Sequence, residues 1–365
     1  MKTVISSYQA TLIITITIIG TSMESLPSLL IQEANQDAWI SLLLITIVTL
    51  LVGIIYFALA KNMKRVDLIN YSRKVFGNFF TIPLALILII AFFLLAGVVI
   101  RETSEIMENA YMPLTPLWFY NLTILLAAIL IVFYGLEVIG RSLEIGFYIF
   151  IAFLSFVIII LISEMSFANL QPVLAGGIGP VIKGSYQGLT FYIETFIILI
   201  LAPQITNKEK VYKSFFCGVI ISTIILLSLI LTILMIFGPY LAKDLSIPVI
   251  NMISFVKKFM IIERLDPFFI FFWIAGGIYK AAIFIYVAVY IAQKLFNRAN
   301  YYIFLIPSMP IVFYISSKYF LKNIAELQNF IIGVVPYYIS IFIIYPLILY
   351  LVAKIRGVEV NEKKQ

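Results

Sequence analysis

Long apolar runs separated by short polar connections repeat along the whole chain. Runs of about 18 or more apolar residues are typical of membrane-spanning helices. Ten runs meet or approach that length, over approximately residues 8–30, 39–60, 81–108, 117–134, 145–163, 183–203, 211–237, 265–293, 301–318 and 336–354. The pattern predicts an all-α polytopic membrane protein with about ten transmembrane helices. We expect residues 1–365 to form a single integral membrane, transporter-like domain, because no separate soluble domain is visible.

The composition excludes a soluble protein. Of the 365 residues, 63% are hydrophobic and only 12% are charged, and the mean hydropathy is +1.09. Soluble globular domains carry about 25% charged residues, so this chain has too few charges to cover a water-exposed surface. A transmembrane β-barrel would show short alternating segments instead of long continuous runs. The net charge of +7 is expected to lie in cytoplasmic loops and not to bind nucleic acid.

The residue types present also limit the chemistry. The chain has no histidine, and its single cysteine, Cys217, lies within an apolar run. Histidine metal sites, Ser-His triads and histidine proton relays are therefore excluded. No P-loop, dinucleotide fingerprint or nucleophile elbow is present either. We expect no enzymatic activity, no cofactor and no metal, and any proton chemistry inside the membrane must use Glu, Asp, Lys or Tyr.

The distribution of basic residues predicts the orientation. With the N-terminus in the cytoplasm, the inner loops hold about twice as many Lys and Arg residues as the outer loops. Such a bias is typical of cytoplasmic loops, so both termini are expected inside. The connection 238–264 runs against the bias with four basic residues on the outer side. Its stretch PVINMISFVKKFM can form an interfacial helix, which tolerates those charges.

Ten spans divide into two halves of five, and an odd number of spans gives the halves inverted topology. In this common transporter plan, discontinuous helices bind the substrate near the bilayer centre. The first helix carries GTSMESLP at 20–27, and the sixth opens with GGIGPVIKGSYQG at 176–188. Glycine and proline in these stretches predict that helices 1 and 6 are both broken.

Two ionisable residues fall near the middle of predicted spans. Glu194 lies in FYIETFIILIL (191–201), and Lys280 lies in GGIYKAAIF (276–284). A charge at the bilayer centre costs at least about 2.5–3.5 kcal/mol, and such residues usually mark a functional pathway. Lys280 needs a carboxylate partner, for which Glu194 and Glu24 are the candidates. It either takes the place of a coupling cation in a charge network beside a ligand, or forms a purely structural ion pair.

A candidate ligand site lies in the first helix. If the helix is unwound there, the amides and hydroxyls of Gly20, Thr21 and Ser22 can hold a carboxylate, and Glu24 can receive an ammonium group. The alternative is a hydrated Glu24 near the outer interface. Tyr192 and Tyr279 are expected to line the pocket, because they lie beside Glu194 and Lys280.

Two further acidic groups lie near the predicted membrane surfaces. In RETSEIME (101–108), the spacing of Glu102 and Glu105 puts both near one helix face at the outer end of the third span. They are expected to line an outer vestibule, most simply a solvated one. Glu137 and Arg141 are four residues apart and predict an inner structural pair on a helix surface.

Short motifs follow one another in a recognisable order. They are ISSYQ (5–9), QDAWIS (36–41), MPLTPLWF (112–119), GLEVIGR (135–141), NLQPV (169–173), FYIETF (191–196), ERLDP (263–267) and GGIYK (276–280). Together with ten spans and a short polar tail, this order resembles the B subunit of spore germinant receptors from endospore-forming bacteria. That family belongs to the amino acid–polyamine–organocation (APC) transporter superfamily.

The resemblance implies an APC or LeuT-like fold with a central pocket between helices one, three, six and eight. It implies a subunit that senses a small-molecule germinant, often an L-amino acid, in the spore inner membrane. The implied partners are an A subunit in the membrane and a C subunit that is a lipoprotein. Two other hypotheses stay open: a proton-coupled amino acid transporter, and a membrane scaffold whose charges only hold helices together.

Overall fold

The protein is a bundle of helices. The computed structural model describes residues 4–64, 66–206, 210–245, 247–256 and 265–358. In chain order, the helices are α1 (Ser7–Ala34), α2 (Ala38–Met63), α3 (Leu68–Ile106), α4 (Leu117–Tyr134), α5 (Leu136–Leu161), α6 (Ile178–Ile193), α7 (Ile197–Leu201), α8 (Val211–Asp244), α9 (Pro248–Phe255), α10 (Asp266–Leu295), α11 (Tyr302–Ser316), α12 (Ile324–Gly333), α13 (Val335–Ile339) and α14 (Tyr345–Ile355).

The predicted spans all have helices in the structure. Among the described residues, eight stretches are long and apolar enough to cross a membrane. One of them, Ser7–Met63, contains both α1 and α2, and Tyr302–Ser316 is a shorter apolar helix. The prediction of an all-α polytopic membrane protein is confirmed.

Side-chain caps begin three of the helices. Ser6 and Gln9 form a reciprocal capping box at the start of α1, in which each side chain accepts a hydrogen bond from the other residue's backbone N–H. Asp67 caps α3 by accepting from the N–H of Asn70, and Asn323 caps α12 by accepting from the N–H of Glu326. Such caps satisfy backbone donors that have no partner inside the helix.

Two long helices are kinked at glycine. Gly77 in α3 has φ 77° and Gly238 in α8 has φ 68°, and Pro239 follows the second. These positive φ values suit a residue without a Cβ. Because α3 continues across its kink to Leu68, it starts well before the apolar run that predicted it.

The sixth span stays helical over Ile178–Gln204, and its break is milder than predicted and lies at a different place: a single 3-10 turn. α6 ends at Ile193, one turn of 3-10 helix covers Glu194–Phe196, and α7 starts at Ile197. The glycines expected to break it lie inside or just before α6. A Cβ at Gly188 would lie 2.8 Å from the Leu26 side chain, so this glycine permits close packing of α6 on α1.

The prediction of a broken first helix is wrong. α1 runs without interruption from Ser7 to Ala34, with Pro27 inside it and buried. Gly20 therefore serves helix packing and does not interrupt the helix: a Cβ there would lie 2.8 Å from the carbonyl oxygen of Gly276 in α10.

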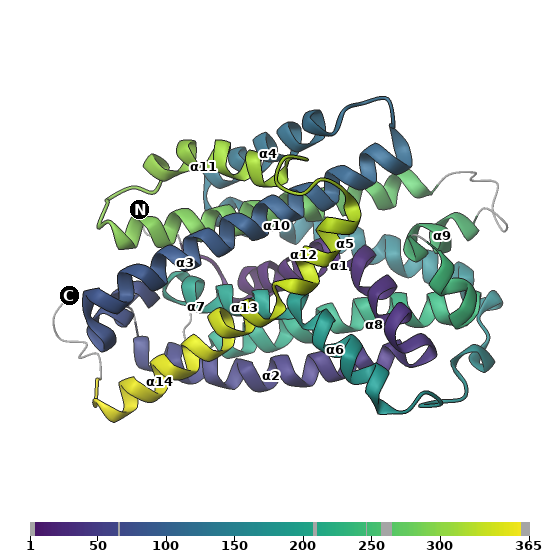
Figure 1. The fold of residues 1–365 in the computed structure, drawn as a ribbon, viewed down its shortest axis with the longest axis horizontal. Coiled ribbons are helices and arrows are strands. Elements are labelled where there is room, and N and C mark those ends of the chain that lie inside the picture. Colours follow the sequence, from purple (N-terminus) through teal and green to yellow (C-terminus); the bar gives the residue numbers. More distant parts are fainter. Residues whose placement is uncertain (1–3, 65, 207–209, 246, 257–264, 359–365) are drawn as a thin grey trace.

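The helices pack as long, nearly side-by-side rods (Figure 1). α3 packs along α10, and α1 packs against α8, α6 and α10. The segment before α1 is tied to the end of the sixth span, since the N–H of Ile5 donates to the Gln204 carbonyl (2.9 Å) and the N–H of Thr206 donates to the Ile5 carbonyl (3.0 Å).

Several of the quoted motifs meet in pairs. Gln36 donates through Nε2 to the Pro172 carbonyl (2.9 Å), and the Asp37 carboxylate accepts from the N–H of Leu174 (2.9 Å). These contacts join QDAWIS to NLQPV and the residue after it. Close packing of Gly140 on Gln9 likewise joins GLEVIGR to ISSYQ.

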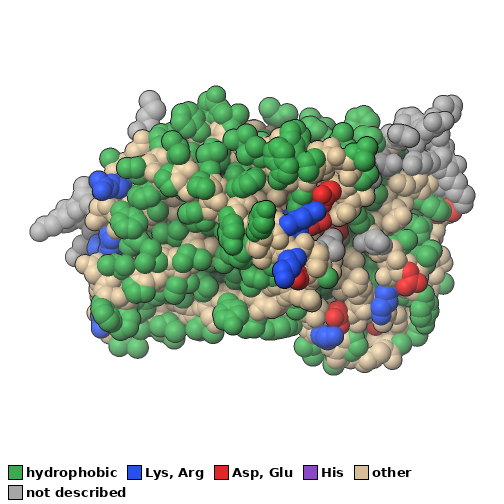
Figure 2. Space-filling model, turned by 45° about the horizontal axis from the view of Figure 1, so that its top comes forward, with side chains coloured by type: hydrophobic (Ala, Val, Ile, Leu, Met, Phe, Trp, Pro, Cys, Tyr) green, Lys and Arg blue, Asp and Glu red, His purple; other side chains and the backbone are tan. Residues whose placement is uncertain are grey.

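The surface has the layering of a membrane protein (Figure 2). Hydrophobic side chains cover most of the visible face, Lys and Arg gather at its left end, and mixed acidic and basic side chains gather toward its right. The expected interfacial helix is present as α9 over Pro248–Phe255. Lys257, Lys258, Glu263 and Arg264 lie outside the described residues.

Candidate functional site

A buried ion pair lies at the centre of the bundle. Nζ of Lys280, on α10, is 2.8 Å from Oε2 of Glu194, and it donates a hydrogen bond of 3.1 Å to Oγ1 of Thr21 on α1. The side chains of Lys280 and Glu194 are 1% and 4% exposed. A buried charge costs several kcal/mol unless an opposite charge compensates it. Among the described residues, Glu194 is the carboxylate within ion-pair distance of Lys280.

The ion pair coincides with the break in the sixth span. Glu194 is the first residue of the 3-10 turn, and Thr195 donates through Oγ1 to the carbonyl of Tyr192 at 2.6 Å. A 3-10 turn in the middle of a longer helix often marks a functional hinge. The break thus lies where the chain also places its deepest charges.

A small inner cavity adjoins this ion pair. Its lining combines polar groups with apolar side chains of α3 and of the segment from α12 to α13. The lining residues are Thr21, Leu95, Val98, Val99, Glu102, Thr190, Phe191, Glu194, Lys280, Phe330, Ile331, Val334 and Tyr338. Thr190 is 4% exposed, and its Oγ1 has no hydrogen-bond partner.

A larger outer cavity, with about 860 Å³ of empty volume, lies next to the inner one. It is more polar, and it lies toward the ends of α1 and α3 that the charge bias assigns to the outer side. Its lining residues are Glu24, Ser25, Ser28, Leu29, Gln32, Glu33, Glu102, Glu105, Ile106, Gln187, Phe191, Leu327, Gln328, Ile331 and Ile332.

Three side chains separate the two cavities. Glu102 of α3, Phe191 of α6 and Ile331 of α12 line both of them. The Phe191 ring also faces the ion pair, since its centroid is 5.6 Å from Nζ of Lys280. These three side chains form the boundary that the two cavities share.

A cluster of aromatic rings lies close to the ion pair, since the Phe284 ring centroid is 5.8 Å from Nζ of Lys280. Phe92 of α3, Phe196 of the 3-10 turn and Phe342 of a π-helical turn form a mutual cluster, with ring centroids 5.1 to 6.3 Å apart. Phe284, one turn beyond Lys280 on α10, adds a fourth ring 5.9 Å from Phe92. All four are fully buried.

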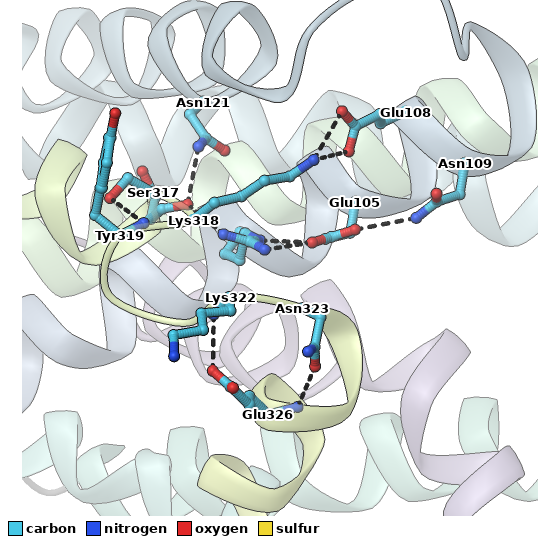
Figure 3. Close-up of polar contacts among 12 residues, drawn as sticks. Glu105, Glu108, Asn109, Asn121, Ser317, Lys318, Tyr319, Lys322, Asn323 and Glu326 are labelled. Carbon is cyan, nitrogen blue, oxygen red and sulfur yellow. Dashed lines mark hydrogen bonds and ion pairs between the residues drawn. The ribbon is translucent and has the colours of Figure 1, made fainter.

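Polar contacts hold the end of α11 and the segment after it to α4 and to the turn that follows α3 (Figure 3). Lys318 pairs with Glu108 at 3.1 Å, and the Ser316 carbonyl accepts from Asn121 at 2.8 Å. Glu326 accepts from the N–H of Lys322 at 2.8 Å, which shapes the turn into α12. These contacts position α12 along the wall of both cavities.

The residues predicted to bind ligand divide into two groups. Thr21, Glu24 and Glu194 line the cavities. Gly20 lies in the contact with Gly276, and Ser22 donates to the carbonyl of Ile18 inside α1. These last two residues therefore serve the packing and the helix.

The two tyrosines predicted to line the pocket do not line either cavity. Tyr192 is fully buried, and its hydroxyl lies 3.1 Å from Oγ1 of Thr223 on α8. Tyr279 is partly buried and packs against the hydrophobic core. The prediction from adjacency to Glu194 and Lys280 was wrong, because neighbouring residues on a helix point in different directions.

Glu102 and Glu105 line the outer cavity as a vestibule, but they are 9% and 5% exposed and not freely solvated. Arg101, assigned to an outer loop by the charge bias, is fully buried and donates through Nε to Glu105 at 2.8 Å. Its Nη1 also donates to the Ser316 carbonyl.

Glu137 and Arg141 form the predicted pair at 2.7 Å, and both are exposed.

The sequence pattern did not predict several of the residues that line the cavities. Ser25 and Thr190 are polar residues beside predicted site residues, and Phe191 stands within FYIETF. The lining from α12 was missed because residues 324–333 were read as a connection, although Ile324–Gly333 carries Ile and Leu at helical spacing. No metal site is formed within the described part of the chain by any group of three acidic or cysteine residues.

Comparison with known proteins gives consistent matches over most of the chain. A family model described as "Spore germination protein" matches residues 4–325. Spore germination protein KB of Bacillus subtilis (strain 168) is 26% identical over 359 residues, which cover 96% of this chain and 95% of that protein. Spore germination protein XB of Bacillus anthracis is 27% identical over 278 residues, which cover 74% and 76% of the two chains.

Solved structures give the same picture of the fold. Mhp1, a nucleobase-cation-symport-1 family transporter in a closed conformation with bromovinylhydantoin bound, superposes with a TM-score of 0.71 at 10% identity, covering 96% of this chain and 78% of that one. MhsT in complex with L-phenylalanine superposes with a TM-score of 0.61 at 12% identity, covering 98% and 90%. At these identities the likeness concerns the fold, which is that of APC and LeuT-like transporters.

Proposed function

Because this chain belongs to the spore germination protein family, we propose that it is the germinant-sensing membrane subunit of a spore germination receptor. It binds a small nutrient, an L-amino acid in the simplest case, in the inner cavity beside Thr21, Glu194 and Lys280. The nutrient enters through the outer cavity. The chain is an integral multi-pass membrane protein, and we place it in the spore inner membrane with both termini in the cytoplasm.

The observation that carries this proposal is the placement of the Lys280–Glu194 pair. The pair lies at the break of the sixth span and lines the small inner cavity, which shares Glu102 and Phe191 with the larger outer cavity. In related folds, broken helices near the bilayer centre bind the substrate. A pair with only a structural role would be expected to pack without a cavity beside it, because burial without voids is what stabilises helix contacts.

The structure also supports a way to pass on the signal. The Phe191 ring on α6 and the Ile331 side chain on α12 line both cavities. A ligand that binds more tightly when these side chains close over it shifts the chain toward that arrangement. We propose that partner subunits, an A subunit in the membrane and a lipoprotein C subunit, read the resulting movement of α12 at the surface of the bundle.

Spores that carry Glu194→Gln test the receptor function. We expect a loss of the nutrient response in spores whose membranes still contain the protein, and its amount is measured in parallel because the substitution leaves Lys280 uncompensated. Glu137→Gln is the matched control, because Glu137 pairs with Arg141 on the surface and lines neither cavity. A normal response in spores with Glu194→Gln would contradict the receptor proposal and favour the scaffold.

A proton-coupled amino acid transporter is the second candidate. The transporter-like fold and the buried, titratable Lys280–Glu194 pair favour it. Uptake of labelled amino acids into proteoliposomes separates the two functions. Concentrative uptake driven by a proton gradient would establish transport, whereas binding without net uptake would support the receptor.

A further inference from the structure

Five glutamates line the two cavities, and three of them have basic partners. These pairs are Glu33 with Lys183 (2.8 Å), Glu105 with Arg101, and Glu194 with Lys280 (2.8 Å). The remaining two are Glu24 of α1 and Glu102 of α3. Among the described residues, neither has a basic side chain within ion-pair distance.

One hydroxyl group connects these two carboxylates. Oγ of Ser25 lies 2.6 Å from Oε2 of Glu24 and 3.4 Å from Oε1 of Glu102. A serine hydroxyl has a single hydrogen to donate, so it cannot satisfy both carboxylates together. When both carboxylates are charged they repel each other, and a cation near both removes that repulsion.

A second feature indicates that a ligand belongs at this place. Thr190 lines the inner cavity together with Glu102, is 4% exposed, and has no hydrogen-bond partner for its Oγ1. A buried polar atom without a partner calls for a ligand or water. The Phe191 ring, which lines both cavities, can add a cation–π contact to a positively charged group.

We propose that Glu24 and Glu102, bridged by Ser25, bind the protonated amine of the ligand. This inference rests on the proposed function and places the ligand's amine at the boundary of the two cavities, because Glu102 lines both and Glu24 lines the outer one. Lys280 is the only basic side chain in the described lining of the two cavities, and Glu194 already pairs with it. The lining therefore offers two unpaired carboxylates to a cation and no unpaired cation to a carboxylate.

The ligand class that follows is a small primary amine. Amino acids belong to it through their α-ammonium group, and so do their amides, which lack the carboxylate. N-acetylated amino acids do not belong to it, because acetylation removes the positive charge. Dicarboxylic amino acids are disfavoured, since their side-chain carboxylates would meet Glu24 and Glu102.

Three matched series of compounds test this on the purified full-length chain. They are the common L-amino acids, their amides and their N-acetyl derivatives, with binding followed by the shift in thermal unfolding. For each side chain that binds, we expect the amide to bind at least as tightly as the free amino acid. The N-acetyl derivative should bind about 10- to 100-fold more weakly, as expected for loss of a charged hydrogen bond.

Glu24→Gln and Glu102→Gln provide the second arm. Each should weaken amide binding about tenfold or more. Glu108→Gln is the control, because Glu108 follows Glu102 on the same span, pairs with Lys318 and lines neither cavity. If a variant fails to fold, the compound series on the wild-type chain still decides the question.

The outcomes separate this inference from the proposed function. Equal binding of free and N-acetylated amino acids, or unchanged amide binding in both variants, would overturn the ammonium site while leaving nutrient binding intact. If no compound of any series shifts the unfolding of the wild-type chain, the proposed amino acid binding fails, and the ammonium site fails with it.

Discussion

Gly20 of α1 and Gly276 of α10 contact each other backbone to backbone. A Cβ added at Gly20 would lie 2.8 Å from the Gly276 carbonyl oxygen, and one added at Gly276 would lie 3.0 Å from the Gly20 carbonyl oxygen. Small residues at helix crossings permit such close approach in membranes. This crossing sets Lys280, one turn after Gly276, beside Thr21.

Gly20→Ala is therefore expected to force α1 and α10 apart. Overpacking of a tight contact costs about 1–3 kcal/mol, so the thermal midpoint of the purified chain should fall. Gly146→Ala on α5 is the control, since no atom lies within 4 Å of a Cβ there. Equal midpoints for the two variants would show that the α1–α10 crossing is not tight.

The Lys280–Glu194 pair should show strong energetic coupling. Glu194→Gln or Lys280→Met alone leaves an uncompensated buried charge, which costs about 3–5 kcal/mol. The double variant removes both charges and should be less destabilised than the sum of the single variants. Denaturant unfolding of the four proteins in a double-mutant cycle measures this coupling, and simple additivity would refute the ion pair.

Two ion pairs with the same four-residue spacing should differ in their contribution to stability. Arg101 is fully buried beside Glu105, so Arg101→Gln is expected to lower the free energy of unfolding by about 3–5 kcal/mol. Arg141→Gln breaks an exposed pair and should cost at most about 1 kcal/mol. Chemical unfolding of both variants measures the difference, and similar values would argue against the burial of Arg101.

Labelling of single cysteines tests the orientation and the outer cavity. In a Cys217→Ser background, the chain has no other cysteine. Ser28→Cys, in the lining of the outer cavity, should react with a membrane-impermeant maleimide added outside. Arg141→Cys should react only after the inner face is exposed. The reverse pattern would invert the topology.

The spans and the central ion pair could be predicted from the sequence because physical rules require them. Apolar runs must become helices in a membrane, and α4 covers residues 117–134, which is the predicted run. A lysine and a glutamate at bilayer depth must find opposite charges, which predicted Glu194 as a candidate partner of Lys280.

Other features depend on tertiary contacts between helices, which the pattern of hydrophobic and polar residues does not reveal. Glycine at position 20 predicted a break, but the role of Gly20 follows from the helix that crosses it. The charge pattern assigned Arg101 to an outer loop, whereas in the structure it is buried and donates to Glu105 and to the Ser316 carbonyl. The lining from α12 depends on how residues 317–323 turn back toward α3, which local sequence does not indicate.

Thermal unfolding of the wild-type chain and of Glu194→Gln across a panel of L-amino acids is the most direct test of nutrient binding at the broken sixth span. A ligand at 100 times its Kd should stabilise the wild-type chain by about 2.7 kcal/mol. We predict that at least one amino acid does so in a concentration-dependent manner and that Glu194→Gln, although folded, loses the effect. An equal shift in both proteins, or no shift with any amino acid, would contradict the account.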